Sequence, residues 1–400
     1  MRSRRPRRDL AVVTTAYGFS MLGTTAAFLA MVLHLRHDGS GWVTALLLAE
    51  LTPFILMGAL AGWLVDRLEA RALLIVVSIG QAIVSVALSM ASSPIAIVAL
   101  VALLGTQAAV ERPAAGALVP HITGEEHATR GYARLSTGRA LGSIGGPAIG
   151  GFVSVAGETR AALLINAASF LILALALTTV GARRRPSGPP GGDGGVGDSV
   201  EAGFRFLVRQ PVLRLAIPLT ALAAGIALAD NVAAPYRFAD DFAVGAVGFG
   251  VYEALYSVCE LIGIQAFTSK LSRGREEKLL AAGNLMLGLG VLGIGLAGNY
   301  PLALAAAVIG GVGNGMSNAG EGVVIRLCTP EALRGRAFAA SGALVQTASI
   351  GGAMAGAPAV AVFGAAGTMV IFGSLAAAVA AVGVVVALSR TTALVPEGKS

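Results

Sequence analysis

The sequence predicts an all-α integral membrane protein in which twelve transmembrane helices form two pseudo-symmetric bundles of six. Three observations support this fold class. First, the 400 residues are 55% hydrophobic and only 13% charged, which leaves too few charges to cover a soluble protein of this size. Second, the apolar residues occur in runs of about 17 to 25, the length that crosses a bilayer core as a helix. Third, the two halves of the chain repeat each other's motifs.

The apolar runs end at charged residues and at clusters of Pro and Gly, and these breaks define the expected helices. The spans must be helical because lipid offers no partners to unpaired backbone groups, and the runs lack the alternation of barrel strands. Five arginines precede the first run, which is too long for a signal peptide and is expected to remain as a span. The twelve expected spans are 10–35, 43–65, 72–92, 94–118, 137–156, 161–182, 215–235, 246–268, 279–299, 301–325, 337–363 and 366–389.

The basic residues are distributed unevenly between the two sides of the predicted membrane. Of the 29 Lys and Arg residues, all but Arg36, Arg160 and Arg237 fall on the side that holds the chain ends. Because cytoplasmic loops are enriched in Lys and Arg, both termini are expected in the cytoplasm, with the protein in a bacterial cytoplasmic membrane. The net charge of +7 is therefore a topology signal, and no nucleic-acid partner is expected.

The longest hydrophilic stretch divides the chain into three expected parts: an N-terminal bundle (1–181), a cytoplasmic linker (182–214) and a C-terminal bundle (215–400). The first part of the linker is rich in Gly and Pro and is expected to be flexible. In its second part, Phe204, Leu207 and Val208 fall on one helical face. That pattern predicts a short interfacial helix, with a plain loop as the alternative.

The two expected bundles share a motif pattern at a constant separation of 206 residues. Thr123, Arg130 and the run Ser143–Gly146 recur as Thr329, Arg336 and Ser349–Gly352. Chance similarity between Gly-rich helices is the alternative, but a single offset across loops and helices argues against it. A parallel repeat of six helices is an architecture that transporters use for alternating access.

The loop after the second span, Gly62–Arg67 followed by Arg71, resembles the loop signature of the major facilitator superfamily. By this resemblance, Asp66, Arg67 and Arg71 form a latch that holds one conformation of the two bundles. Such a latch is physically reasonable because a carboxylate at a helix end can bind arginines and the N-terminus of a neighbouring helix. The second copy, around 270–275, lacks the acidic residue, so a weaker second latch is expected.

The fifth span resembles the Gly-Pro motif of the superfamily's proton-coupled exporters. Small residues let helix backbones approach closely and Pro removes a backbone donor, so the motif implies a bend at a helix contact. Close helix packing without a role in export is the structural alternative. The motif residues are Gly142, Gly146, Pro147, Gly150 and Gly151.

More narrowly, Arg112 with Pro113, Leu118 to Pro120 and the segment 201–214 look like the subgroup of the enterobactin exporter and macrolide-efflux proteins. This resemblance covers essentially the whole chain. It departs at Gly23 and Thr24, where many members carry Gly-Asp, so an acid is not expected there. The resemblance does not identify the substrate.

Acidic residues within the spans are candidates for proton coupling, because an ionised side chain at the bilayer centre costs about 2.5 to 3.5 kcal/mol. Glu253 and Glu260 are seven residues apart on one span, so they share a helical face. Glu50 lies in the other bundle at about the same depth as Glu253, and Asp230 lies near the outer end of its span. A structural hydrogen bond to a neighbouring helix is the alternative role for these acids.

By the resemblance, spans one, four, seven and ten line a central cavity whose mostly apolar walls suit an amphipathic organic solute. Glu111 and Arg112 on the fourth span bind a charged solute there or, as the alternative, snorkel to the membrane surface. The expected cavity residues are Tyr17, Ser20, Thr24, Phe28, Glu111, Arg112, Tyr252, Tyr256, Asn314, Asn318 and Glu321.

These features imply a secondary active transporter that exports a small amphipathic organic molecule, such as a drug, siderophore or secondary metabolite, by proton antiport. The alternatives are a proton-coupled uptake symporter of the same fold and, in another class, a membrane-embedded enzyme or a non-transporting receptor. The expected partners are the solute, protons and the lipid bilayer, and the chain is expected to be a monomer. No cofactor or metal is expected, since Cys259 and Cys328 lack metal-ligand spacing and no Walker motif occurs.

Overall fold

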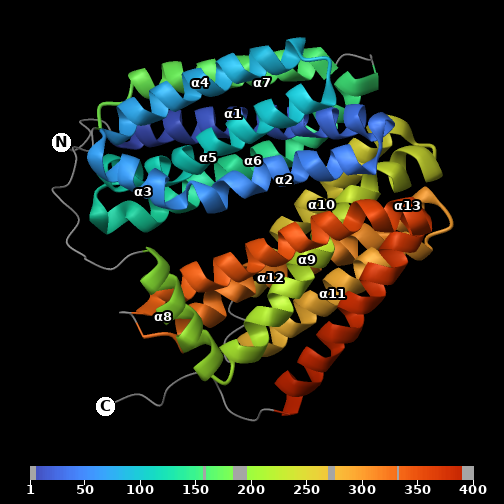
Figure 1. Ribbon diagram of the computed structural model, residues 1–400. Helices are drawn as coiled ribbons and strands as arrows, with labels where there is room; N and C mark the ends of the chain where they lie inside the picture. The colour runs from blue at the N-terminus through green and yellow to red at the C-terminus, as the bar shows by residue number, and fades with distance from the viewer. Residues whose placement is uncertain (1–5, 156–158, 183–195, 269–274, 331–332, 390–400) are drawn as a thin grey trace, which may run out of the picture. The chain divides into compact units, whose positions relative to one another are not determined.

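A computed structural model describes residues 6–155, 159–182, 196–268, 275–330 and 333–389. Every regular element within these ranges is a helix, so the predicted all-α fold class is confirmed (Figure 1). The N-terminal half contains α1 (Pro6–Leu35), α2 (Ser40–Leu56), α3 (Gly58–Arg67), α4 (Ala70–Met90), α5 (Pro94–Thr123), α6 (Ala128–Val155) and α7 (Thr159–Thr178). The C-terminal half contains α8 (Val196–Arg209), α9 (Leu213–Tyr236), α10 (Gly245–Thr268), α11 (Glu276–Leu296), α12 (Tyr300–Cys328) and α13 (Arg334–Ser389).

In two places the observed helices do not correspond one to one with the expected spans. The second span is broken at Met57 into α2 and α3, shortly after Pro53, which cannot donate a backbone hydrogen bond. The last two spans are merged in α13, where Gly364 turns the chain with a φ of 70° that favours glycine. By length and hydropathy alone, nine helices in the described ranges could cross a membrane, and α2 is a shorter apolar helix.

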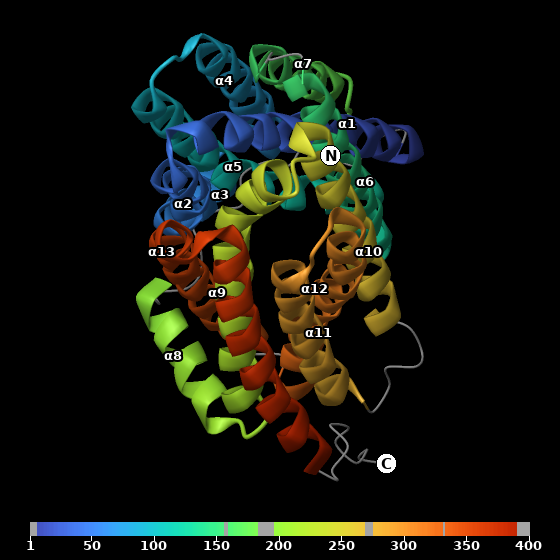
Figure 2. The ribbon, with the colours of Figure 1, turned by 90° about the vertical axis from the view of Figure 1, so that its right-hand side faces the viewer.

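The chain divides into two compact units. The first contains α1 to α7 together with Gly245–Ala254 of α10, and the second contains α8, α9, the rest of α10 and α11 to α13. In the first unit α4 lies beside α7, and in the second α11 lies beside α12, as both views show (Figures 1 and 2). A helix that is shared between the units was not anticipated from the sequence, because the predicted boundary follows the linker.

In the first unit, α4 turns its polar side chains inward and exposes apolar side chains. Ser78, Gln81 and Ser85 are at most 2% exposed, whereas Val76 and Ile83 are more than 60% exposed. In water this arrangement would be unfavourable, but in a bilayer the apolar face contacts lipid and the polar face finds partners in the protein. The inward polar face of α4 is therefore available to build a site.

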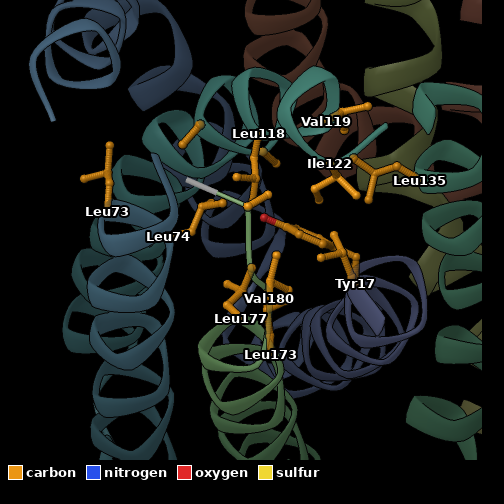
Figure 3. Close-up of a cluster of buried hydrophobic side chains, with 14 of the residues drawn as sticks. Tyr17, Leu73, Leu74, Leu118, Val119, Ile122, Leu135, Leu173, Leu177 and Val180 are labelled. Carbon is orange, nitrogen blue, oxygen red and sulfur yellow. The ribbon is translucent and has the colours of Figure 1, made fainter. Parts of the chain in front are cut away.

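Apolar residues fill the remaining interior of the first unit. Figure 3 shows Tyr17 of α1 with its hydroxyl directed toward Leu74 and Leu118, and with Leu173 and Leu177 of α7 nearby. These residues bring α1, α4, α5 and α7 together around one core. Three helices, α1, α5 and α7, thus pack around α4.

The linker contains α8, which packs on the second unit. Leu207 is buried with Ile217 of α9 and Val324 of α12, and Gly203 lies against the backbone of Arg336 at the start of α13. Phe204 and Val208 are exposed. The apolar face expected from the sequence is therefore divided between a buried part and an exposed part.

Glycine contacts recur at the same places in the two units. A Cβ atom added to Gly105 of α5 would lie 2.9 Å from the carbonyl oxygen of Glu50 on α2. In the second unit, a Cβ on Gly311 of α12 would lie 2.8 Å from the carbonyl oxygen of Tyr256 on α10. Both residues of this pair are separated from their counterparts by 206 positions, so the sequence repeat corresponds to a repeated helix contact.

Candidate functional site

The first unit places charged side chains at membrane depth on α5. Glu111 and Arg112 are adjacent in sequence but lie in different surroundings. Glu111 is 8% exposed, and its Oε2 accepts a hydrogen bond of 2.8 Å from Nε2 of Gln81 on α4. Arg112 is exposed, and its guanidinium carbon lies 4.4 Å from the ring centroid of Phe54 on α2. Since consecutive residues on a helix point about 100° apart, one faces the bundle interior and the other faces away from it.

Further charged groups surround Arg112. It interacts electrostatically with Glu50 on α2, with its neighbour Glu111 and with Arg139 on α6. Two acids and two bases thus interact in one membrane-spanning region, and the Phe54 ring lies against one of them, Arg112. Such a group can hold a solute that carries both charge and an aromatic or apolar surface.

Tyr17 lies at the inner edge of this group. Its side chain is 2% exposed, and its hydroxyl interacts electrostatically with Glu111 and Arg139 without making a hydrogen bond of standard geometry within the described residues. The hydroxyl of Ser78 and Oε1 of Gln81 are also buried without a hydrogen-bond partner in the described part of the chain. The interior around Glu111 therefore contains more polar atoms than its own hydrogen bonds satisfy.

A second polar layer in the first unit is better satisfied. Thr24 of α1 donates to a side-chain oxygen of Asn166 on α7 at 3.3 Å and to the carbonyl oxygen of Ser20 at 2.9 Å. Asn166 in turn donates to Ser85 of α4 at 3.3 Å, and Ser169 donates to its carbonyl oxygen at 2.7 Å. This layer is neutral and connects three helices.

The second unit contains a compact neutral network. Asn284 of α11 accepts a hydrogen bond from Ser317 of α12 at 2.6 Å and donates to Thr220 of α9 at 3.4 Å. All three side chains are at most 3% exposed. Their hydrogen bonds tie three helices together without any charge.

Three acids of the second unit have different surroundings. Glu260 of α10 accepts a hydrogen bond of 2.9 Å from Asn318 of α12. Glu321 of α12 accepts a short hydrogen bond from Ser341 of α13. Asp230 of α9 is 4% exposed, and its Oδ1 has no hydrogen-bond partner within the described residues.

The remaining predicted residues are distributed along α1, α10 and α12. Tyr252 is 2% exposed and stacks on Phe249 with ring centroids 6.0 Å apart. Glu253 is half-buried and belongs to the part of α10 that packs with the first unit, whereas Glu260 belongs to the second. Ser20 is buried, while Phe28, Tyr256 and Asn314 are half-buried and Asn318 is exposed.

The glycines of the expected exporter motif make two kinds of contact. Cβ atoms added to Gly142, Gly146 and Gly150 of α6 would meet the backbone of α1. A Cβ on Gly151 would lie 3.2 Å from the Cα of Gly250 on α10, whose own added Cβ would lie 2.6 Å from the carbonyl oxygen of Pro147. The motif therefore joins α6 closely to two helices, and α6 continues as a helix through Pro147.

The latch residues are described in part. The Arg67 guanidinium carbon lies 4.6 Å from the Trp63 ring centroid, and Arg71 donates to the carbonyl oxygen of Thr178 at the end of α7 with a distance of 2.7 Å. The Asp66 side chain lies outside the described residues. The second copy of the motif, at 270–275, also falls mainly outside them, since 269–274 are not described.

Two charged residues make structural contacts that sequence reasoning missed. Asp9 in the first turn of α1 is 4% exposed and accepts a 2.8 Å hydrogen bond from the backbone N–H of Gly181. Arg237, in the π-helical segment after α9, is 9% exposed and donates to the carbonyl oxygen of Ala297 at 2.6 Å. It also donates to the carbonyl oxygen of Gly295 at 3.2 Å and pairs with Asp241 at 3.1 Å. Both residues satisfy backbone groups near helix ends.

Comparison with protein families gives one match. A family model described as Major Facilitator Superfamily matches residues 9–280 of the chain. A search of curated protein sequences finds no match.

Comparison with solved structures gives full-length similarity to transporters. A bacterial homolog of the human lysosomal transporter Spinster, in an inward-facing and unoccupied conformation, is 16% identical, with 96% of this chain and 95% of that chain covered and a TM-score of 0.70. A POT family transporter in complex with 5-aminolevulinic acid is 14% identical, with coverage of 96% and 97% and a TM-score of 0.75. The nucleoside transporter NupG is 13% identical, with coverage of 96% and 100% and a TM-score of 0.72. At these identities the similarity establishes the fold alone.

Proposed function

Because the chain belongs to the Major Facilitator Superfamily, a family of secondary transporters and not of enzymes, we propose that it exports a small amphipathic organic molecule in exchange for protons. The solute, for example a drug, a siderophore or a secondary metabolite, would leave a bacterial cell through the cytoplasmic membrane. In this proposal the transporter is a monomer in the lipid bilayer, with both termini in the cytoplasm.

The observation that carries the proposal is the group of Glu50, Arg112 and Phe54 in the first unit. Phe54 offers an aromatic surface, and Arg112 stacks on it within electrostatic reach of Glu50. A solute with an apolar body and a polar end has a partner for each part. Glu50 and Arg112 offer the polar end of the solute a charge of either sign. Acids embedded in the spans, which can bind a proton when shielded and release it to water when open, would couple this site to proton movement.

The direction of transport is supported by the Gly-Pro motif on α6. Gly146 and Gly151 hold α6 close to α1 and to α10, and the motif resembles that of proton-coupled exporters in the family. The wider resemblance to the enterobactin exporter and macrolide-efflux proteins supports the same direction. One proton that crosses 100 mV supplies about 2.3 kcal/mol, enough for roughly 40- to 50-fold accumulation of a neutral solute.

The test is proton flux in oriented proteoliposomes during a screen of amphipathic antibiotics, siderophores and dyes. We expect inward proton movement coupled to outward solute movement. Glu50→Gln, Glu253→Gln and Glu260→Gln test three embedded acids for a role in coupling, and Glu201→Gln on the exposed face of α8 is the matched control. Proton and solute movement in the same direction would show an uptake symporter, and solute movement without proton flux would exclude the proposed coupling.

A further inference from the structure

Asp230 differs from the other embedded acids because, within the described residues, no side chain is found to hydrogen-bond or pair with it. It lies on α9 of the second unit, six residues before the helix ends, which corresponds to about 9 Å of helical rise. The side chain is 4% exposed, and Oδ1 has no hydrogen bond within the described residues. Glu50, Glu111, Glu260 and Glu321 each interact with a polar or charged side chain from another helix. Asp230 is therefore the acid whose ionised form is least compensated.

No cation from the helices that pack on α9 compensates for the charge of Asp230. α9 packs against α8, α11, α12, α13 and the π-helical segment. Between Ala337 and Ser389, α13 has no charged residue. The charged residues of α11 are in its first turn and those of α12 are in its last turns, whereas the end of α9 lies beside the end of α11 and the start of α12. Through Leu207, α8 packs against Ile217 near the start of α9, whereas Asp230 is near the end of that helix.

Arg237 is the nearest cation along the chain, but its guanidinium group is already occupied. It lies seven residues after Asp230, so it is on the same side of the helix and about 10 Å further along. Its donors bind the carbonyl oxygens of Gly295 and Ala297 at the end of α11, and it pairs with Asp241. Asp240 is exposed and carries the same sign of charge as Asp230.

The first unit provides an internal comparison for this position. Thr24 is 206 residues before Asp230, and it belongs to a hydrogen-bonded layer that includes Ser20, Ser85 and Asn166. The residues 206 positions after those three are Ile226, Val291 and Phe372. The polar layer of the first unit is thus replaced in the second by apolar residues and one acid. Thr24 makes a structural hydrogen bond, whereas Oδ1 of Asp230 makes none within the described residues.

We infer that Asp230 is the group that binds and releases the proton that drives transport. Shielded among apolar residues, it holds a proton on one carboxylate oxygen as a neutral acid; opened to water, it gives that proton to a water molecule and becomes a carboxylate. This inference rests on the proposed proton antiport and assigns its proton site. It favours Asp230 over Glu50, Glu253 and Glu260, although the sequence placed Asp230 close to the outer end of its span.

Infrared difference spectroscopy of the protein in lipid bilayers tests this assignment without any substrate. Between alkaline and near-neutral buffer, a range in which ordinary carboxyl groups stay ionised, we expect a carbonyl stretching band from a protonated Asp230. Asp230→Asn should remove the band and Asp230→Glu should shift it, whereas Glu201→Gln on the exposed face of α8 should leave it unchanged. A band that survives Asp230→Asn, or that Glu201→Gln also removes, would overturn the assignment. Thermal unfolding of Asp230→Asn checks that the variant is folded.

Transport separates failure of the assignment from failure of the proposed function. Ethidium is the probe, driven by an imposed pH gradient in proteoliposomes. Asp230→Asn should lower proton-coupled ethidium movement to the level of protein-free liposomes, while exchange of ethidium across the membrane without a gradient continues. Unchanged coupling in Asp230→Asn would overturn the assignment and leave antiport in place. Wild-type ethidium movement without proton flux would overturn antiport, and the infrared result would then decide whether Asp230 binds a proton.

Discussion

Thr14, Ser78 and Glu111 of the first unit occupy positions that are held by Thr220, Asn284 and Ser317 in the second, 206 residues later. In the second unit these three side chains bind one another in a neutral network. In the first, Glu111 binds Gln81 instead, and the hydroxyl groups of Thr14 and Ser78 have no hydrogen-bond partner in the described ranges. The same positions therefore hold a closed network in one unit and a charged, incompletely satisfied group in the other.

Ten residues further along α1 and α9, at Thr24 and its counterpart Asp230, the difference between the units is reversed. Thr24 belongs to a satisfied neutral layer in the first unit, whereas Oδ1 of its counterpart Asp230 has no hydrogen-bond partner among the described residues of the second. The glycine contacts at Gly105 and Gly311 are the same in both units. Close helix contacts thus maintain the repeated scaffold, and the polar residues between them are free to differ. The two repeats therefore hold different polar groups at equivalent levels.

The largest effects are expected at the shared glycine contacts. Gly105→Ala and Gly311→Ala would each place a Cβ within 3 Å of a backbone carbonyl oxygen, and the helices would have to move apart at a cost of up to about 3 kcal/mol. Gly116→Ala and Gly322→Ala on the same two helices are the controls, because their added Cβ atoms have no neighbour closer than 3.9 Å. Chemical unfolding in mixed micelles measures the difference. Equal stability of Gly105→Ala and Gly116→Ala would show that the contact does not maintain the repeat.

A smaller effect should distinguish the neutral network around Asn284 from the equivalent group around Ser78. Asn284→Ala leaves Thr220 and Ser317 without their partner, which should lower the free energy of unfolding by about 2 kcal/mol. Ser78→Ala at the equivalent position of the first unit removes a hydroxyl that has no described partner, so stability should be unchanged or slightly higher. The same unfolding assay applied to both variants tests this contrast. A similar loss in both would mean that Ser78 has a partner and that the units are more alike than their hydrogen bonds indicate.

The contrast in stability between variants of Thr24 and of its counterpart Asp230 should be about half that size. Thr24→Val removes the hydrogen bond to Asn166 while preserving shape, with an expected loss of about 1 kcal/mol. If Asp230 holds a proton as proposed, Asp230→Asn replaces a neutral acid with a neutral amide of similar shape, so little loss of stability is expected at neutral pH. Thermal unfolding of the two variants in one detergent gives the comparison. A large loss for Asp230→Asn would indicate that the ionised carboxylate is stabilised by a partner.

The smallest effect concerns α8, a helix that lies outside the repeat. Arg205→Ala breaks an ion pair with Glu201 whose N–O distance is 3.0 Å, but both side chains are more than half exposed. Solvent screening and side-chain entropy limit the change to about 0.5 kcal/mol or less. Salt titration of the unfolding midpoint checks this value, since a larger effect should decline with ionic strength. A larger effect without salt dependence would point to a packing role for the Arg205 stem.

Most of the fold follows from composition and run length, because lipid restricts a spanning segment to a helix of fixed length. The break at Met57 was missed although Pro53 is visible in the sequence, since a proline in a spanning helix does not always interrupt it. The family and its transport role follow from motifs and are established by the family match. Transport direction, coupling and substrate remain predictions.

The missed polar contacts have a common physical reason. Asp9 binds a backbone N–H that is 172 residues away, and Arg237 binds carbonyl oxygens at the end of α11. Backbone groups leave no mark in the sequence, so neither partner can be identified from residue types. The burial of Asp230 also depends on neighbouring helices, so its position near the outer end of a span could not predict it. Glu111 and Gln81 are on separate helices, and only the packing of α4 on α5 joins them.

The uncharged stretch of α13 has a consequence for how the chain enters the membrane during synthesis. From Ala337 to Ser389 the translocation machinery meets two apolar segments joined by a turn at Gly364, with no charge that must be carried across the bilayer. Such a pair can insert together as a helical hairpin. Nothing within the hairpin distinguishes its two orientations, so its direction must be set by the flanking residues Arg334, Arg336 and Arg390. A positive charge introduced at Gly364 would oppose them and slow insertion of this pair of segments.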